Sequence, residues 1–233
     1  MRETLERGLE ALGLGTESAP ALAAYAGLVL ERNQVMNLTA ITEPEAFAAL
    51  HLLDSLALIP LTELEAGSAV DVGTGAGFPG VPLAIALPPL HVTLLDSLGK
   101  RVDFLRESCG ALGLKNTACI HARAEEFAGE RRESFDFAVS RAVAELPVLC
   151  ELCLPLVKVG GRFLAMKSSH CDEEMGRAER AIALLGGRTG WVRDYTVPTT
   201  EVVHRVVCVE KVSPTPPQYP RRFAQIKKRP LGT

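Results

Sequence analysis

The sequence predicts an α/β fold in which a mostly parallel sheet carries helices on both faces. From Ser68 onward, short runs rich in β-branched residues alternate with longer helical runs, which is the pattern of parallel strands joined by crossover helices. The alternation ends in two β-branched runs, 189–197 and 202–212, joined by a short turn. These runs predict an antiparallel pair that closes one edge of the sheet, so we expect seven strands with the last one antiparallel.

The chain before this alternation is predicted to be helical. Apolar residues recur at helical spacing in 4–12 and 21–32, and they form a broad face in 43–58. No glycine-rich linker follows, so we expect an N-terminal helical cap packed on the main domain. The division that results is a cap over 1–62, a main domain over 63–213 and a tail over 214–233.

The elements of the main domain follow from the same alternation. Parallel strands are expected near 68–73, 91–96, 117–122, 135–140 and 161–167. Helices are expected at 78–87, 99–113, 145–158 and 172–185.

A glycine-rich turn follows the first of these strands. The segment from Ser68 to Gly80 reads S-A-V-D-V-G-T-G-A-G-F-P-G and leads into an apolar run that can form a helix. Such a turn gathers backbone N–H groups at a helix N-terminus, and the missing Cβ atoms let a ligand approach the main chain. The turn therefore predicts a site for a nucleotide-like cofactor.

Two overlapping patterns in this turn predict different cofactors. The segment 75–80 matches G-x-G-x-x-G, the dinucleotide fingerprint, and 71–77 matches D-x-G-x-G-x-G, the pattern of S-adenosylmethionine (AdoMet) methyltransferases. A dinucleotide places a pyrophosphate on the helix, whereas AdoMet needs a carboxylate near its ammonium and sulfonium end, so Asp71 favours AdoMet. Asp96, at the end of the next strand, suits ribose hydroxyls in either case.

The carboxyl ends of the strands locate the rest of the expected site, because ligands of open α/β sheets bind there. Besides the glycine turn, the ends fall at 96–98, 123–127, 140–142 and 166–168. Ala124 and Glu125 are placed to read an adenine, although Glu125 and Glu126 could simply begin a helix.

The composition is that of a soluble globular protein, with 47% hydrophobic and 23% charged residues. No apolar run approaches the ~18 residues that span a bilayer, and 1–13 is polar rather than a signal peptide, so we expect a cytoplasmic protein without a membrane partner. The six cysteines fit reduced core thiols, and C-E-L-C at 150–153 lacks the second pair or histidines of a zinc site, so no metal is expected.

The end of the chain is basic although the net charge is −3. A stretch without acidic residues contains Arg221, Arg222, Lys227, Lys228 and Arg229. Such a tail often serves only to solubilise a terminus, but a protein that neutralises phosphates would also place it beside its active site.

Several blocks of the sequence, taken together, resemble one family. They are N-L-T at 37–39, H-L-L-D-S-L at 51–56, the glycine turn through Gly80, L-L-D-S-L-G-K-R at 94–101, R-A-E-E-F at 123–127, S-R-A at 140–142, M-K at 166–167 and Y-P-R-R at 219–222. In these blocks the chain resembles the RsmG (GidB) methyltransferases, which act on guanine N7 of small-subunit ribosomal RNA. The segment 223–226 replaces a Gly- and Pro-richer tail of the relatives, and His204-Arg205 stands where some have the reverse order.

The resemblance implies a class I (Rossmann-like) AdoMet-dependent fold with an N-terminal helical extension, and an enzyme acting on 16S ribosomal RNA or the small subunit. We expect the protein to be a monomer. It implies a cofactor site formed by the glycine turn, the second and third strand ends and the end of the fourth strand. The residues are Gly73, Thr74, Gly75, Gly77, Phe78, Asp96, Ser97, Leu98, Ala124, Glu125 and Arg141.

Guanine N7 carries a lone pair and no proton, so methyl transfer to it needs alignment rather than a general base. We expect Arg141 to position the cofactor or the base and Asn37 to hydrogen-bond the guanine edge. Phe78 is expected to contact the methionine end of the cofactor or to stack on the base. Arg141 could instead form a salt bridge to the cap, and His51 and Asp54 are expected to be contacts between cap and domain. Phosphate contacts are expected from Arg123, Lys167, Arg221, Arg222, Lys227, Lys228 and Arg229.

Three other functions remain open at this stage. An AdoMet enzyme acting on a small molecule or a protein would share the fold and the glycine turn. An NAD(P)-dependent oxidoreductase is supported by 75–80 alone, and a non-catalytic nucleoside- or RNA-binding module would bind AdoMet without transferring a methyl group.

Overall fold

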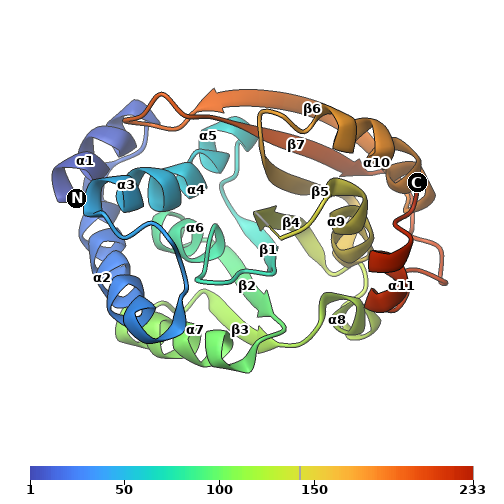
Figure 1. The fold of residues 1–233 in the computed structure, drawn as a ribbon, viewed down its shortest axis with the longest axis horizontal. Coiled ribbons are helices and arrows are strands. Elements are labelled where there is room, and N and C mark those ends of the chain that lie inside the picture. The colour runs from blue at the N-terminus through green and yellow to red at the C-terminus, as the bar shows by residue number, and fades with distance from the viewer. Residues whose placement is uncertain (142, 233) are drawn as a thin grey trace.

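A seven-stranded sheet lies between two layers of helices in the computed structural model of the chain, which describes residues 1–141 and 143–232 (Figure 1). The strand order is β3-β2-β1-β4-β5-β7-β6. The first five strands are mutually parallel, and β7 runs antiparallel to both β5 and β6. The strands are β1 (Gly67–Val72), β2 (Leu90–Asp96), β3 (Thr117–His121), β4 (Phe135–Arg141), β5 (Val157–Ser168), β6 (Gly187–Thr196) and β7 (Val203–Lys211).

One layer of helices contains the N-terminal part of the chain. Its helices share a hydrophobic core with one face of the sheet, in which Tyr25, Phe47 and Leu94 are buried. The members are α1 (Arg2–Ala11), α2 (Ala19–Met36), the helical segment Pro44–Thr62, α6 (Gly80–Ala86) and α7 (Gly99–Ala111). Within Pro44–Thr62, a turn of π-helix at Ala48–Leu53 separates α3 (Pro44–Phe47) from α4 (Asp54–Leu56) and α5 (Leu58–Thr62).

The other layer covers the opposite face of the sheet with a second core. Its helices are α8 (Ala124–Glu130), α9 (Leu146–Cys153), α10 (Asp172–Leu184) and α11 (Phe223–Lys228). Because both faces are covered, the central strands are largely buried and contain near-continuous apolar runs. The edge strand β6 is mostly exposed and bears charges such as Arg188 and Asp194, which discourage pairing with another chain.

The expected seven strands and their order of appearance along the chain are confirmed, with corrections to three elements. Within the helix expected over 145–158, α9 ends at Cys153, a 3-10 turn continues over Leu154–Leu156, and β5 begins at Val157 rather than at 161. Pro155 lacks an N–H donor and favours this early end, while the positive φ of Gly160 (89°) lets the longer strand turn. The sequence also did not predict α11, and Ala142 of the expected fourth strand end lies outside the described residues.

The segment Pro44–Thr62 is long and apolar enough to cross a membrane, contrary to the expectation that no run approaches that length. However, 67% of its apolar window is buried inside the protein, as in a helix of a protein core. All six cysteines are free, and Cys150 and Cys153 are buried in α9, as expected for core thiols. Within residues 1–141 and 143–232, no group of three or more His, Cys, Asp or Glu side chains could hold a metal ion.

Candidate functional site

Two cavities lie at the carboxyl ends of the strands. The chain leaves β1 toward β2 on one side and leaves β4 toward β5 on the other, which creates the crevice where α/β sheets bind ligands. The smaller cavity, about 120 Å³, is lined by residues at or just after the carboxyl ends of β1, β2 and β3, together with Val143, Leu152 and Phe223. The larger cavity, about 410 Å³, is lined by Ile41, Leu50, His51, Asp54, Arg141, Met166, Lys167, Ser168, Glu174, Val202 and His204.

The smaller cavity gathers much of the expected cofactor site. Its lining includes Gly73, Asp96, Ser97, Ala124 and Glu125. The Asp96 carboxylate joins two parts of this lining, because Oδ2 accepts from the Gly75 N–H at 2.9 Å and Oδ1 from the Leu98 N–H at 2.9 Å. The end of β2 therefore fixes the position of the glycine turn.

The glycines of the turn meet different requirements. Gly73 has a φ of 71°, and a Cβ there would lie 2.7 Å from Val143 Cγ2. Gly77 has a φ of 88° and faces the core, because a Cβ there would lie 2.1 Å from the Tyr25 hydroxyl. Gly73 therefore allows close approach beside the cavity, whereas Gly77 allows the turn to pack on α2.

Asp71 is fully buried and holds the turn together. Its Oδ2 accepts from Thr74 Oγ1 at 2.6 Å and from the Gly80 N–H at 2.8 Å, and its Oδ1 has no hydrogen-bond partner among the described residues. Burial raises the pKa of Asp71 to about 6, although these hydrogen bonds oppose the rise. This burial does not fit the expected direct contact with a ligand ammonium. Thr74 is likewise buried within the turn.

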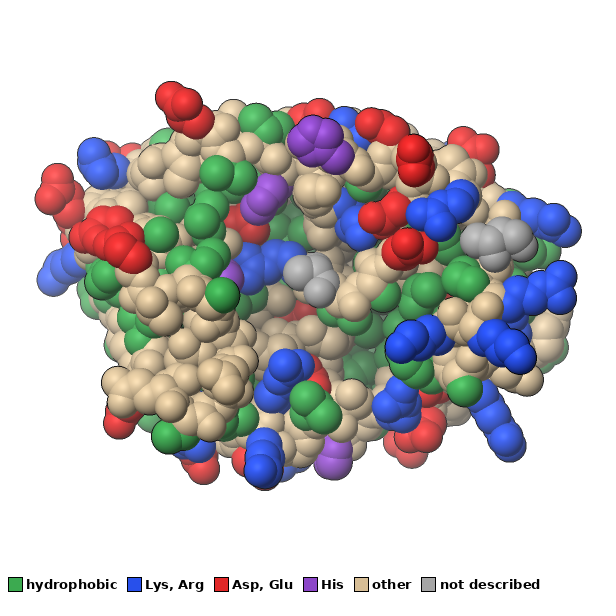
Figure 2. All heavy atoms as spheres, viewed as in Figure 1, with side chains coloured by type: hydrophobic (Ala, Val, Ile, Leu, Met, Phe, Trp, Pro, Cys, Tyr) green, Lys and Arg blue, Asp and Glu red, His purple; other side chains and the backbone are tan. Residues whose placement is uncertain are grey.

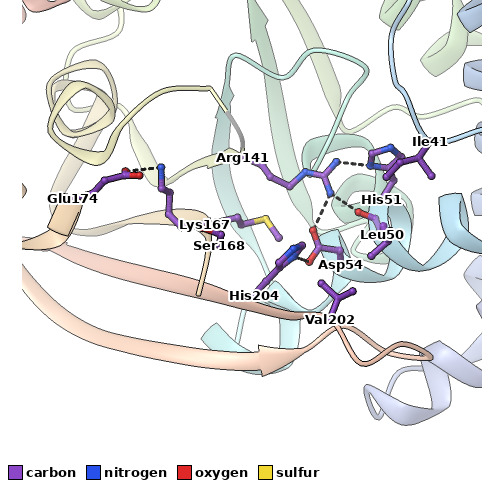
Figure 3. Close-up of a pocket in the computed structure, with 11 residues that line it drawn as sticks. Ile41, Leu50, His51, Asp54, Arg141, Lys167, Ser168, Glu174, Val202 and His204 are labelled. Carbon is purple, nitrogen blue, oxygen red and sulfur yellow. Dashed lines mark hydrogen bonds and ion pairs between the residues drawn. The ribbon is translucent and has the colours of Figure 1, made fainter. Parts of the chain in front are cut away.

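Arg141 forms the centre of the larger cavity's wall, at the end of β4 (Figure 3). Its Nη1 donates to the Leu50 carbonyl at 3.0 Å and to Asp54 Oδ2 at 2.9 Å, and its Nη2 donates to His51 Nδ1 at 3.0 Å. The guanidinium also lies 5.1 Å from the centre of the Phe78 ring. Arg141 thus both lines a cavity and joins the sheet to the helix 44–62, so the salt bridge considered as an alternative is present.

His51 is neutral in this arrangement. Burial, followed by the charge of Arg141, lowers the pKa of His51 to about 4. Since Nδ1 accepts from Arg141, the ring proton lies on Nε2, which donates to Thr39 Oγ1 at 2.7 Å. The ring stacks on Phe78 with centres 4.8 Å apart, and Phe78 is itself almost fully buried.

Asp54 connects three distant segments through one carboxylate that is only 1% exposed. Besides Arg141, it binds Tyr195 Oη at 2.7 Å and His204 Nδ1 at 2.8 Å, both through Oδ1. Burial disfavours its charge, but the hydrogen bonds from His204 and Tyr195 and the charge of Arg141 lower the pKa of Asp54 below its ordinary value. Asp54 is therefore ionised and fully paired.

The sequence predicted His51 and Asp54 as contacts between cap and domain, but it did not predict that they line a cavity or which residues they contact. The spacing of His51 and Asp54, three residues apart on a helix, was a signal that both lie on one face. No local pattern connects them to Tyr195 or His204, which come from the terminal strand pair.

Most of the residues predicted to contact RNA or the base lie outside the two cavities or are already paired. Asn37 ends α2 with a φ of 49°, is exposed, and lines neither cavity. Lys167 lines the larger cavity but pairs with Glu174 at 2.7 Å, and Arg221 pairs with the buried Glu151 at 2.6 Å. Exposed cations of the tail are Arg222, Lys227, Lys228 and Arg229, and Figure 2 shows Lys and Arg side chains gathered over α11.

The family model and the curated relatives that match this chain indicate the same family. The model of the GidB family, described as rRNA small subunit methyltransferase G, matches residues 18–202. A relative from Alkaliphilus metalliredigens named ribosomal RNA small subunit methyltransferase G is 45% identical over 232 residues and covers 97% of both chains. One of the same name from Geobacillus thermodenitrificans is 44% identical over 229 residues, covering 97% of this chain and 95% of its own.

Solved structures share the fold at low identity. MtNAS in complex with MTA and tNA has a TM-score of 0.56 and 17% identity, covering 80% of this chain and 71% of its own. M. jannaschii TYW2 in complex with AdoMet has a TM-score of 0.51 and 16% identity, covering 64% and 70%. These likenesses show the fold alone, and they confirm the expected class I, Rossmann-like architecture.

Proposed function

The chain belongs to the GidB family, rRNA small subunit methyltransferase G, and on that premise we propose that it transfers a methyl group from AdoMet to N7 of one guanine in 16S ribosomal RNA. The observation that carries this function is the match over nearly the whole chain, which includes both the glycine turn and the segments that line the larger cavity. The methyltransferase family also argues against the oxidoreductase considered from 75–80.

The smaller cavity suits the adenosine part of AdoMet. The Asp96 carboxylate is the group expected to bind ribose hydroxyls, while Leu95, Ala122 and Leu152 supply apolar surface for a purine ring. Gly73 and Val143 line this cavity together, and the missing Cβ of Gly73 lets the Val143 side chain lie close to the turn. When bound, AdoMet supplies a methyl group carried by a positively charged sulfur.

The larger cavity suits the target guanine. Arg141 has five N–H groups, and three are used by its partners in the described part of the chain, which leaves two to donate to guanine O6 beside N7. Asp54 balances the charge of Arg141, so the purine, which gains positive charge on methylation, does not face an unpaired cation.

No residue has to remove a proton in this mechanism, and the neutral His51 is consistent with a positioning role. Holding N7 in line with the methyl group can contribute about 7–11 kcal/mol to the rate where alignment is good. We therefore assign Arg141, His51 and Asp54 to the orientation of the base. A hydrogen bond from Asn37 to the guanine edge stays a prediction, because Asn37 lies outside both cavities.

Contacts to RNA phosphates are proposed for cations in or near the cavities. Arg123 is exposed and lines the smaller cavity, whereas Lys167 lines the larger one, is largely buried and pairs with Glu174. Arg222, Lys227, Lys228 and Arg229 are exposed at the tail, which supports a contact with phosphates, whereas Arg221 is already engaged by Glu151. We expect a cytoplasmic, metal-independent monomer. Light scattering would check the oligomeric state, and methyl transfer in the presence of a chelator would check the independence from metal.

Transfer of labelled methyl groups tests the function directly. The substrates are 16S RNA and small subunits from a strain that lacks this protein, and the modified nucleoside is identified by mass. We expect 7-methylguanosine at one site with the wild-type chain and none with Arg141→Ala. Binding of AdoMet without transfer to either substrate would contradict the proposed function.

A further inference from the structure

The smaller cavity has one wall that comes from the C-terminal tail. Phe223, the first residue of α11, lines this cavity together with Arg123, although the two are 100 positions apart in the sequence. We propose that Phe223 is a cofactor-binding residue whose ring forms one wall of the cavity and stacks on the adenine base of AdoMet. This inference rests on the proposed function for the identity of the ligand.

The position of the Phe223 ring is fixed by neighbours that line the same cavity. The Arg123 guanidinium lies 4.6 Å from the centre of the Phe223 ring, a cation–π contact. Arg123 Nε in turn donates to Glu125 Oε1 at 2.9 Å. Arg123 and Glu125, which follow β3, therefore orient the Phe223 ring at the cavity.

The tail is anchored to the second core. Ile226, one turn after Phe223, is fully buried among the residues of that core. Arg221 donates to both carboxylate oxygens of Glu151, at 2.8 Å to Oε1 and 2.6 Å to Oε2, and Glu151 is fully buried in α9. A bidentate ion pair of this kind fixes the orientation of the two side chains as well as their distance. The backbone next to Phe223 is therefore held in a defined position.

A purine is the ligand that this wall suits. Apolar side chains of Leu95, Ala122 and Leu152 line the same small space as Phe223, and Asp96, a carboxylate suited to ribose hydroxyls, lines it too. Aromatic rings stack on the flat faces of bases, and this interaction tolerates any base because each has a π face. A ribose acid beside an aromatic wall therefore matches the adenosine unit.

Binding of S-adenosylhomocysteine to the full chain, measured by titration calorimetry, tests the inference without relying on activity. We expect Phe223→Ala to weaken binding by about 5- to 50-fold, as for loss of a base-stacking aromatic side chain. Phe223→Tyr keeps the ring and should bind within about twofold of the wild type. Gln225→Ala, on the exposed surface of α11 and outside both cavities, is the matched control and should leave binding unchanged.

A variant that keeps α11 packed separates the ring from the general integrity of the helix. Phe223→Leu retains an apolar side chain under Arg123, and urea unfolding without ligand shows whether the fold is preserved. Weaker binding by this variant with an unchanged unfolding midpoint would support the stacking role. Wild-type affinity in Phe223→Leu or in Phe223→Ala would overturn it.

The two proposals fail in distinguishable ways. Methyl transfer to 16S RNA by the wild-type chain, with unchanged ligand affinity in Phe223→Ala, would remove only the role of Phe223. Loss of ligand affinity in Phe223→Ala, with no transfer to RNA by the wild type, would remove only the RNA substrate.

Discussion

Replacement of Asp54 by Ala tests whether the buried charge network holds the larger cavity together. The change removes the acceptor of Arg141, Tyr195 and His204 and leaves the Arg141 guanidinium without its only carboxylate partner in the described part of the chain. Removing one member of a buried pair costs about 3–5 kcal/mol, because the remaining charge stays uncompensated. This loss is a large part of the 5–15 kcal/mol that is typical for a whole domain.

Urea unfolding followed through the single tryptophan, Trp191, and by circular dichroism measures the free energy of unfolding. Asp103→Ala is the matched control, because Asp103 pairs with Arg106 at 2.9 Å but is 66% exposed. Exposed pairs contribute little, so we expect the control to lose less than about 1 kcal/mol. A loss below about 1 kcal/mol for Asp54→Ala as well would refute the reasoning from burial.

Arg141→Ala is expected to abolish methyl transfer while S-adenosylhomocysteine binds within about twofold of wild type, since Arg141 lines the larger cavity rather than the smaller one; unchanged turnover would contradict this. Because the folded pKa of His51 is lowered to about 4, the unfolded chain binds more protons between about pH 4 and 6.5, and stability falls as the pH falls through this window. Relative to His51→Gln, the wild type should lose up to about 3 kcal/mol of its free energy of unfolding across this pH window. A difference in unfolding free energy between the two proteins that does not change with pH would argue against a buried neutral ring. Gly77→Ala should cost about 2–4 kcal/mol in urea unfolding, since its φ is positive and its Cβ would meet Tyr25. Gly110→Ala, in α7 with nothing within 4 Å, should instead gain about 0.5–1 kcal/mol, and equal effects of the two changes would refute the distinction.

The main sheet was predictable because its signals are local. The glycine turn, Asp96 at the end of β2 and the alternation of apolar runs each lie within a few residues of the element that they predict. α11 was not predictable in this way, because a six-residue helix has little stability alone and depends on burial of Ile226 and on the pair between Arg221 and Glu151.

The candidate site was predictable in part for the same reason. Arg141 and Glu125 stand at strand ends, so topology alone places them at the carboxyl edge. The contact between Asp54 and His204 spans 150 positions and has no local signature. Asn37 was expected near a base because of its sequence block, but the position of its side chain depends on how α2 ends.

The network around Asp54 also determines when this wall can form during synthesis. Asp54 is made early, Arg141 much later, and Tyr195 and His204 only as the ribosome completes the last two strands. A nascent chain that has already formed β1 to β4 still carries an acid on the helix 44–62 that lacks two of its three partners. Because chains emerge from the N-terminus, the larger cavity acquires its native wall only after β6 and β7 have been synthesised.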